Sequence, residues 1–352
     1  MNDTIAPSTE ILVIKDYKGA FCSNISSMKK NTSMDIDKIE KYFSNENIKL
    51  NKIAISDIDL NEDFSGKFIL YTSSEDSDLR YKSYIEDVVW TIHLKGGILL
   101  PRVELLRAHH NKTMMEGLRY VLFPDEAARL KTRLLGCAEE AKAVSAFLSY
   151  PQVLKTAAGA GSAGVCKADT PAQMEAAAAR ISRSRLTWNE ILREKAKRAL
   201  YSWWHPRSLH RDKFISQNMI RNLSGDIKVL CFGDRFYALS RQNRPDDFRA
   251  SGSGRFSHDL PDTIVVKDLM AFADRIYRTI DCPVLSLDIG FDGKDFWMIE
   301  FQCLHFGTLT AEYSKSYYNR ADEWRPKAEI CDIEHVYAEA VLSYIARYQS
   351  RQ

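Results

Sequence analysis

In the first hundred residues, short apolar segments alternate with segments whose apolar residues have the spacing of a helix. Four short apolar runs are suited to buried strands, at residues 10–17, 49–56, 66–76 and 98–101. Residues 35–45 have helical spacing and a capping aspartate, and residues 81–97 form an amphipathic pattern closed by two glycines. Because strands that alternate with helices form βαβ units, this segment predicts a mostly parallel, doubly wound sheet in an α/β protein.

The middle of the chain has a different pattern. Residues 111–123 and 124–148 are helical by spacing and propensity, and so is the alanine- and arginine-rich region 169–205. Between them, a short apolar strand ends at Lys155, and residues 158–164 follow as a loop of glycine, alanine and serine.

The last third is rich in strands. Residues 213–220 form one strand, and residues 226–241 form a hairpin around a Gly233-Asp234 turn suited to type II′ geometry. After a helix near 267–280, residues 283–302 form a second hairpin through an Asp-Gly turn. A final helix over 332–348 completes a set of α+β subdomains that follow the parallel unit.

The composition of the chain argues against several classes of function and partner. The 352 residues carry a formal net charge of +2, so nucleic acid is not an expected partner. No stretch reaches the roughly 18 apolar residues of a membrane span, and the first ten residues are polar, so we expect a cytoplasmic protein without a membrane partner. Seven cysteines without a C-x-x-C pair argue against a disulfide framework or a structural zinc site.

The glycine loop is the first candidate for chemistry. Gly159, Gly161 and Gly164 let backbone N–H groups approach phosphate oxygens, and Lys155 adds positive charge. The loop does not match the G-x-x-x-x-G-K-[ST] pattern of a P-loop, and it does not follow the first strand of a βαβ unit as a Rossmann loop does. The alternative is an ordinary surface turn beside a solvated lysine.

The second candidate is a group of oxygen ligands on the last hairpin. Glu300 and Gln302 lie two residues apart on a strand and therefore share a face, and Asp288 of the partner strand lies roughly across from Ile299 and Glu300. Two carboxylates and an amide oxygen on rigid strands suit Mg²⁺ that bridges nucleotide phosphates. The alternative is a solvated sheet face with incidental carboxylates.

Cations surround the first hairpin. Lys228 and Arg241 lie on it, and Arg249 and Arg255 flank the glycine–serine segment 250–254. Such side chains clamp a transferred phosphoryl group or a substrate carboxylate, although each taken alone also fits an ordinary surface charge.

Several weaker signals accompany these groups. His305 follows the metal strand and is a candidate for contact with substrate or phosphate. His109 and His110 are candidates to line an active-site cleft. Residues 202–205, with two tryptophans, fit core or interface packing better than a stacking platform. Three residues end a strand of the first domain, where doubly wound units bind ligands, namely Ser73, Ser74 and Glu75.

The order of these features resembles the ATP-grasp superfamily, and the resemblance spans most of the chain to Gln302. It implies a pre-ATP-grasp βαβ domain over 1–110, a helical linker with a small lid over 111–215, and a C-terminal subdomain with the metal site over 216–352. Members of the superfamily sandwich ATP between the lid and the C-terminal subdomain, and they are often dimers. A homodimer is therefore one assembly that the resemblance implies.

The resemblance also implies roles for particular residues. Lys112 matches the helix lysine that faces the nucleotide phosphates, and Lys155 the strand lysine near the α-phosphate and adenine. Asp226 and Lys228 match a D-x-R segment, in which Lys228 replaces the usual arginine, and Arg241 matches the arginine after it. The phosphate loop corresponds to residues 158–164, with Gly159, Gly161, Ser162 and Gly164 as its contacts. The adenine hinge corresponds to Gln217, Asn218, Met219 and Ile220. The Mg²⁺ ligands correspond to Asp288, Glu300 and Gln302, where many relatives have asparagine at the last position.

The function implied is an ATP- and Mg²⁺-dependent ligase that activates a small carboxylate as an acylphosphate for attack by an amine or thiol. In that reaction Lys228, Arg241 and Arg255 would serve as catalytic cations. Two alternatives remain open: a kinase or tailoring enzyme that acts on a sugar or peptide, and a nucleotide-binding regulatory protein without turnover, which the glutamine at position 302 favours.

Overall fold

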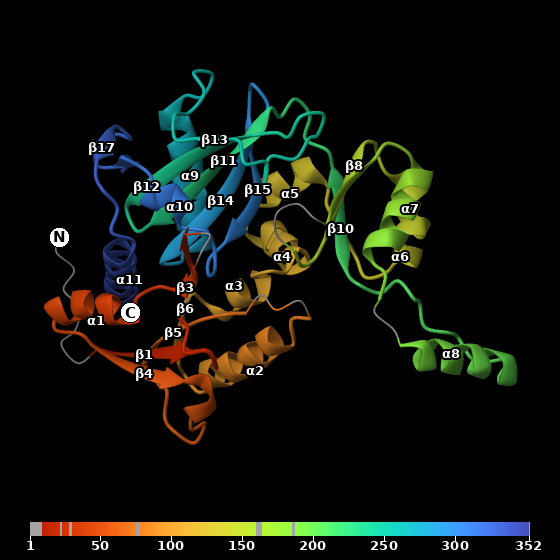
Figure 1. Ribbon diagram of the computed structural model, residues 1–352, viewed down its shortest axis with the longest axis horizontal. Helices are drawn as coiled ribbons and strands as arrows, with labels where there is room; N and C mark the ends of the chain where they lie inside the picture. Colours follow the sequence, from red (N-terminus) through yellow and green to blue (C-terminus); the bar gives the residue numbers. More distant parts are fainter. Residues whose placement is uncertain are drawn as a thin grey trace. The chain divides into compact units, whose positions relative to one another are not determined.

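The computed structural model describes residues 9–21, 23–27, 30–74, 76, 78–159, 164–184 and 187–351. They form two compact units (Figure 1). Unit 1 combines residues 1–109 with residues 222–352, and unit 2 consists of residues 110–221. Unit 1 therefore combines residues from both ends of the sequence, whereas the boundaries of the three domains expected from the sequence stay predictions.

A parallel sheet forms the first part of unit 1. Its strands lie in the order β4-β1-β5-β6, and every neighbouring pair is parallel, as the sequence predicts. The strands are β1 (Glu10–Lys15), β4 (Lys49–Ala54), β5 (Phe68–Tyr71) and β6 (Ile98–Leu100). A short hairpin of β2 (Ser23–Ser27) and β3 (Lys30–Ser33) and the 3₁₀ turn η1 (Ile55–Asp57) complete the segment.

Helices cover both faces of this sheet, which is the doubly wound arrangement. One face packs in a single core with α1 (Ile36–Asn45) and with α11 (Ile333–Gln349) from the far end of the chain. The other face packs against α2 (Arg80–Leu94) and α3 (Val103–Ala108). Asp35 caps α1 as predicted, because its carboxylate accepts hydrogen bonds from the N–H groups of Asp37 and Lys38.

Polar contacts also join α1 to α11. Lys38 Nζ lies 2.6 Å from Asp332 Oδ1 and 3.2 Å from Glu334 Oε2, and the Tyr42 hydroxyl donates to Asp332 Oδ2 at 2.7 Å. Asp332 is the N-cap of α11. The start of the last helix is therefore attached to the first helix of the chain.

A larger antiparallel sheet forms the rest of unit 1. Its strands lie in the order β15-β14-β11-β12-β16-β17, and β13 pairs with β12. The two predicted hairpins are its centre: β11 (Gly225–Phe232) with β12 (Arg235–Gln242), and β14 (Val284–Phe291) with β15 (Phe296–Gln302). The remaining elements are β13 (Phe256–Ser257), α9 (Val266–Ile280), α10 (Leu309–Glu312), β16 (Ser316–Tyr318) and β17 (Pro326–Ala328).

The two faces of this sheet differ. One face carries Ile227, Val229, Leu287 and other apolar residues, and α9 covers it through an edge-on contact between Tyr277 and Phe236 (Figure 1). The opposite face is apolar at one end, where Leu230, Phe232 and Val284 join the core around α11. At its other end that face is polar, and the candidate active site lies there.

Unit 2 is built on a small antiparallel sheet in the order β7-β10-β8-β9. Its core includes Leu154, Phe214 and the alanine face of α7. The strands are β7 (Arg133–Leu135), β8 (Gln152–Thr156), β9 (Val165–Ala168) and β10 (Phe214–Asn218). The helices are α4 (Lys112–Leu122), α5 (Pro124–Leu130), α6 (Ala138–Val144), α7 (Pro171–Ile181) and α8 (Trp188–Leu200), with the 3₁₀ turn η2 (Ser145–Phe147) after α6.

Some sequence expectations for unit 2 were wrong. The segment 124–148 is not continuously helical, because β7 interrupts it to pair with β10. The helical region 169–205 ends at Leu200, and it is divided into α7 and α8. Among the described residues, no helix combines the length and the apolar character needed to cross a membrane.

Candidate active site

A β-bulge sets the register of the last hairpin. Met298 pairs with Ile289, but the next pair joins Glu300 to Asp288, so Ile299 is an extra residue in β15. Residues directly opposite in a ladder point to the same face, and the carboxylates of Asp288 and Glu300 therefore lie side by side. Gln302 pairs with Ser286 and faces the same way. The predicted convergence of the three side chains is present, whereas their role as metal ligands stays a prediction.

Two cations contact Asp288 from the neighbouring strands. Lys228 of β11 lies opposite Asp288, with its Nζ 3.5 Å from Oδ1. Arg241 of β12 lies opposite Asp226, where its Nε is 2.6 Å from Oδ1, and its Nη2 is 2.8 Å from Asp288 Oδ2. Arg241 thus bridges two aspartates, and four strands contribute to one charged surface.

Burial and charge set different pKa values for the two aspartates. Burial raises the pKa of Asp226 to about 6, and the negative charge of Asp288 adds to this rise against the opposing effect of Arg241. Burial also disfavours the charged form of Asp288, but Arg241 and Lys228 outweigh it and hold its pKa well below the usual value. Asp288 is therefore ionised at neutral pH, and Asp226 is the group of the pair that takes up a proton near pH 6.

Arg255 lies beside the strand that carries Arg241, because its carbonyl accepts a hydrogen bond from the Gln242 N–H at 2.9 Å. Its side chain is exposed, and its Nη1 donates to the backbone carbonyl of Asn243 at 3.3 Å. Arg249 forms an ion pair with nearby Asp247, with 2.6 Å between Nη2 and Oδ2. Of the predicted cations, Lys228 and Arg241 share Asp288 as a partner. The catalytic role expected of Arg255 stays a prediction.

His305 connects the end of β15 to the parallel sheet of the same unit. Its Nε2 accepts a hydrogen bond from the Ser73 N–H at 3.1 Å and lies 2.6 Å from the Thr72 hydroxyl. The His109 ring lies 5.6 Å away between centroids. The sequence indicated His305, Ser73 and His109 separately, but it did not single out Thr72 as their partner. Ser74 is half-buried, and Glu75 lies outside the described residues.

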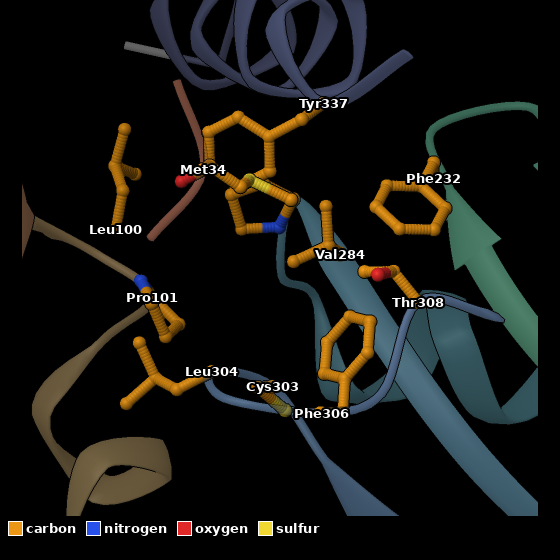
Figure 2. Close-up of a pocket in the computed structure, with 11 residues that line it drawn as sticks. Met34, Leu100, Pro101, Phe232, Val284, Cys303, Leu304, Phe306, Thr308 and Tyr337 are labelled. Atoms are coloured by element: carbon orange, nitrogen blue, oxygen red, sulfur yellow. The ribbon is translucent and has the colours of Figure 1, made fainter. Parts of the chain in front are cut away.

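The neighbours of His305 fix its loop. Leu304 is buried in the core beneath α2, and Phe306 in the core around α11. Figure 2 shows both side chains beside a cavity of about 20 Å³, which Pro101, Val284 and Tyr337 also line. A cavity of this size holds a water molecule at most, so it is not a substrate pocket. Its tight packing instead holds the backbone on both sides of the histidine.

In unit 2, the start of α4 holds the glycine loop. Lys112 Nζ donates to the Gly159 carbonyl at 3.1 Å, and the Gly159 N–H donates to His110 Nε2 at 3.2 Å. Gly159 has φ +124°, a conformation that favours glycine. A Cβ at Gly164 would lie 2.0 Å from Thr156 Oγ1. Both glycines are therefore required by the backbone, whereas Gly161 and Ser162 lie outside the described residues.

Lys155 and Gln217 share the face of the unit 2 sheet that points away from its apolar core. Both are buried, with 7% and 3% of their surface exposed. Gln217 Oε1 is buried without a hydrogen-bond partner among the described residues. An unsatisfied buried amide oxygen is costly unless a ligand supplies a donor, which fits an adenine amino group.

The other residues of the predicted hinge have partners inside unit 2. The Asn218 Oδ1 accepts from Gln152 Nε2 at 2.8 Å, and the Met219 N–H donates to the Pro151 carbonyl at 3.1 Å. Ile220 is half-buried just beyond β10. The side chain of Asn218 therefore serves the sheet, and a contact of this residue with adenine would have to use its backbone.

The donor set of the charged surface suits a hard cation. Asp288, Glu300 and Gln302 offer carboxylate and amide oxygens, which Mg²⁺ prefers. Among the described residues, no three His, Cys, Asp or Glu side chains cluster closely enough to hold a metal ion.

Solved structures that resemble the chain include ATP-grasp proteins. D-cycloserine synthetase shares 14% identity over 96% of this chain and 99% of its own, with a TM-score of 0.53. An ATP-grasp RimK domain protein from Sphaerobacter thermophilus shares 11% identity over 95% of this chain and 100% of its own, with a TM-score of 0.48. Biotin carboxylase from Campylobacter jejuni, in complex with an ATP analogue, shares 14% identity over 95% of this chain and 71% of its own, with a TM-score of 0.46.

No protein-family model matches the sequence, and no curated protein matches it. The similarity to D-cycloserine synthetase is one of fold, because identity is low along the whole length. The chain therefore has the ATP-grasp fold.

Proposed function

We propose that the chain is an ATP- and Mg²⁺-dependent ligase that activates a carboxylate as an acylphosphate for attack by an amine or thiol. The observation that carries this proposal is the alignment of Glu300, Asp288, Lys228 and Arg241 across adjacent strands. This arrangement places oxygen ligands beside fixed cations on a rigid sheet, which is the composition needed to hold and transfer a phosphoryl group.

Asp288, Glu300 and Gln302 would hold Mg²⁺, which when bound would neutralise charge on the nucleotide phosphates. Arg241 and Lys228 would stabilise the negative charge that develops on the transferred phosphoryl group. Their present ion pairs with Asp288 keep both cations in position before substrate arrives. Arg241 stays charged at any relevant pH, because its two aspartate partners raise its pKa further against the opposing effect of burial.

The nucleotide-binding residues would come from unit 2. Lys112 and Lys155 would contact the phosphates, the loop around Gly159, Gly161, Ser162 and Gly164 would supply backbone donors, and Gln217–Ile220 would contact adenine. The unsatisfied Oε1 of Gln217 supports this assignment. The acylphosphate step would place the γ-phosphoryl group on a substrate carboxylate and release ADP. An amine or thiol would then displace phosphate.

A screen for ADP release tests the proposal. The full chain would be incubated with ATP, Mg²⁺ and pools of small carboxylates and amines. We expect one combination of pools to stimulate release, and Glu300→Gln to lower that rate at least about 100-fold. Glu323→Gln, an exposed change elsewhere in unit 1, serves as the matched control and should keep full activity. Stimulated release that survives Glu300→Gln would exclude the assigned metal site.

One observation favours a second candidate, a nucleotide-binding protein without turnover. Both oxygens of Asp288 are already paired with cations, and an amide stands at position 302. In that case calorimetry would detect ATP binding while every pool leaves ADP release at background. Appearance of activity in Gln302→Asn would then show that this glutamine had suppressed catalysis.

A further inference from the structure

The helix α8 exposes an apolar surface that the fold leaves uncovered. None of its side chains is buried, although its sequence is amphipathic. Trp188, Leu192 and Leu200 are 79%, 59% and 73% exposed, and Trp203 just beyond the helix is 67% exposed. The residues at 202–205 were expected in a core or an interface, so the exposure of Trp203 corrects the first of these expectations.

The following segment packs against the opposite, polar side of α8. Trp204 lies over Lys197, with Nζ 4.1 Å from the ring centroid, and its Nε1 donates to Glu194 at 3.0 Å. Arg207 lies 3.6 Å from the same glutamate. The segment after the helix therefore packs on the polar side of α8, which is stable in water without it. The apolar side of α8 stays exposed.

Positive charge surrounds this apolar side. Arg193, Lys195 and Arg198 are exposed on α8, whereas its two glutamates are engaged by the capping box and by Trp204. Residues 187–213 contain seven Lys and Arg against three Asp and Glu, a net charge of +4. The whole chain has a net charge of +2, so everything outside this segment has a net charge of −2.

We propose that this α8 surface, formed by Trp188, Leu192, Leu200 and Trp203 with the exposed cations beside them, binds the anionic headgroup layer of a lipid bilayer. An amphipathic helix with Trp and Leu on one face and Lys and Arg around it lies in the plane of such an interface. Indole rings favour the boundary between water and acyl chains, and a tryptophan stands near each end of this surface.

The same features weigh against protein partners. A second copy of the chain would bring a like-charged surface against this one, and the two would repel. Lys195 lies between Trp188 and Ala199 on the apolar side, seven residues after the first and four before the second. A packed protein interface would bury this charge at a cost, whereas in a bilayer the long side chain reaches the headgroups.

This inference is independent of the proposed ligase activity, and it differs from the expectation drawn from composition. The net charge of the whole chain gave no indication of a membrane partner, because the acidic remainder offsets the basic segment. The absence of a spanning helix among the described residues does not bear on it, since binding in the interface requires none.

Co-sedimentation of the full chain with vesicles tests the proposal. One set of vesicles is phosphatidylcholine alone, and the other contains three parts phosphatidylcholine to one part phosphatidylserine. We expect binding to the second set at about 0.1 M salt and its loss at about 0.5 M salt, because screening weakens the attraction of lysine and arginine to the surface. Tryptophan fluorescence should shift to shorter wavelength on binding.

Three variants locate the binding surface. Arg193→Gln/Lys195→Gln/Arg198→Gln should weaken binding about 100-fold, at about fivefold for each cation removed. Trp188→Ser/Leu192→Ser should weaken it at least about tenfold. Ile330→Ser removes an even more exposed apolar side chain from unit 1 and should bind as the parent does. Circular dichroism confirms that the variants are folded, which is expected because α8 buries no side chain.

Each other outcome overturns the proposal. Equal binding by the α8 variants and the parent would place the membrane contact elsewhere. No binding to either vesicle set, together with a dimer in gel filtration that Trp188→Ser/Leu192→Ser abolishes, would assign the surface to a second copy of the chain. No binding and no α8-dependent dimer would exclude a membrane role and leave an acidic protein as the partner class to test.

Discussion

Glu300 faces Asp288 because the strand that carries it contains one residue more than its partner. A regular ladder continued from the Met298–Ile289 pair would set Ile299 opposite Asp288 and turn Glu300 toward the apolar face. The bulge therefore decides whether the two carboxylates meet. Gly290 provides the space for it, since a Cβ there would lie 3.0 Å from the Leu223 side chain and 3.3 Å from Ile299 Cδ1.

Gly290→Val should disturb the bulge by filling that space. We expect the free energy of unfolding to fall by about 1–3 kcal/mol, the usual cost of overpacking, and the carboxylates to lose their alignment. Urea denaturation measures the first effect. Gly117→Ala is the control, because nothing lies within 4 Å of that position and it is in a helix, so this change should stabilise by up to about 1 kcal/mol. Equal stabilities for the two variants would contradict this account of the bulge.

Arg241→Met should destabilise unit 1 strongly. It leaves Asp226 and Asp288 beside each other without their shared partner, and breaking a largely buried ion pair from one side costs about 3–5 kcal/mol. Arg241→Lys should lose less, because an ammonium retains the charge but cannot reach both carboxylates as the guanidinium does. Denaturation at neutral pH gives both values, and a loss below about 1 kcal/mol in Arg241→Met would show that the network contributes little.

Asp226 should make the stability of the protein depend on pH. Its pKa of about 6 lies above the usual value of 3.8, so the folded state binds its proton more tightly than the unfolded state does. The resulting stabilisation is complete below about pH 4 and is lost as the pH rises through 6. The lowered pKa of Asp288 acts in the opposite sense, but only at more acidic pH.

The variant Asp226→Asn isolates the contribution of Asp226 to the pH dependence of stability from the contributions of the other titratable groups. The parent loses stability between pH 5 and pH 8 as Asp226 gives up its proton, whereas the variant has no proton to lose at this position. The free energy of unfolding of the variant minus that of the parent should therefore be larger at pH 8 than at pH 5. Loss of the contact with Arg241 lowers the stability of the variant by a constant amount and does not change this comparison. Denaturation at the two pH values measures the difference, and Asp262→Asn, at an exposed position, is the control. A difference between parent and Asp226→Asn that does not change with pH would refute the raised pKa.

Gly164→Ala should weaken ATP binding at least about tenfold if the glycine loop contacts phosphate. The new Cβ would clash with Thr156, and the loop would leave the position set by the bond from the Thr156 N–H to the Gly164 carbonyl. Thr156→Ala in the same chain should recover part of the loss. Calorimetric titration with ATP measures each affinity, and Gly136→Ala, with only ordinary contacts, should bind as the parent does. Unchanged affinity in Gly164→Ala would remove the loop from the nucleotide site.

The sequence predicted the parts of the fold that depend on local pattern. Strands such as Glu10–Lys15 and both hairpins follow from apolar runs and glycine turns, and the cap at Asp35 follows from residue type. The sequence did not predict β7, whose three residues become a strand only because β10 offers an edge to pair with. It did not predict α3 either, since six residues are too few for a visible helical period.

In the candidate site too, some features follow from the local sequence pattern, and others depend on how distant strands pack. Asp288, Glu300 and Gln302 were recognisable from alternation along two strands, but the extra residue at Ile299 depends on packing over Gly290 and has no signature in the sequence. The bridge that Arg241 forms between two aspartates also depends on the order of strands across the sheet. Arg255 was selected by its position beside the glycine–serine segment, and its side chain is exposed, so its role stays a prediction.

The route of the chain has a consequence for synthesis on the ribosome. Unit 2 is complete once residue 221 has been made, so it is able to fold while unit 1 still lacks its second half. The first sheet waits longest within unit 1, because α11, which covers one of its faces together with α1, is made after every other described helix and strand. A nascent chain stalled before residue 333 should therefore expose the apolar face of β1, β5 and β6 to chaperones, although those strands are translated more than 200 residues earlier than α11.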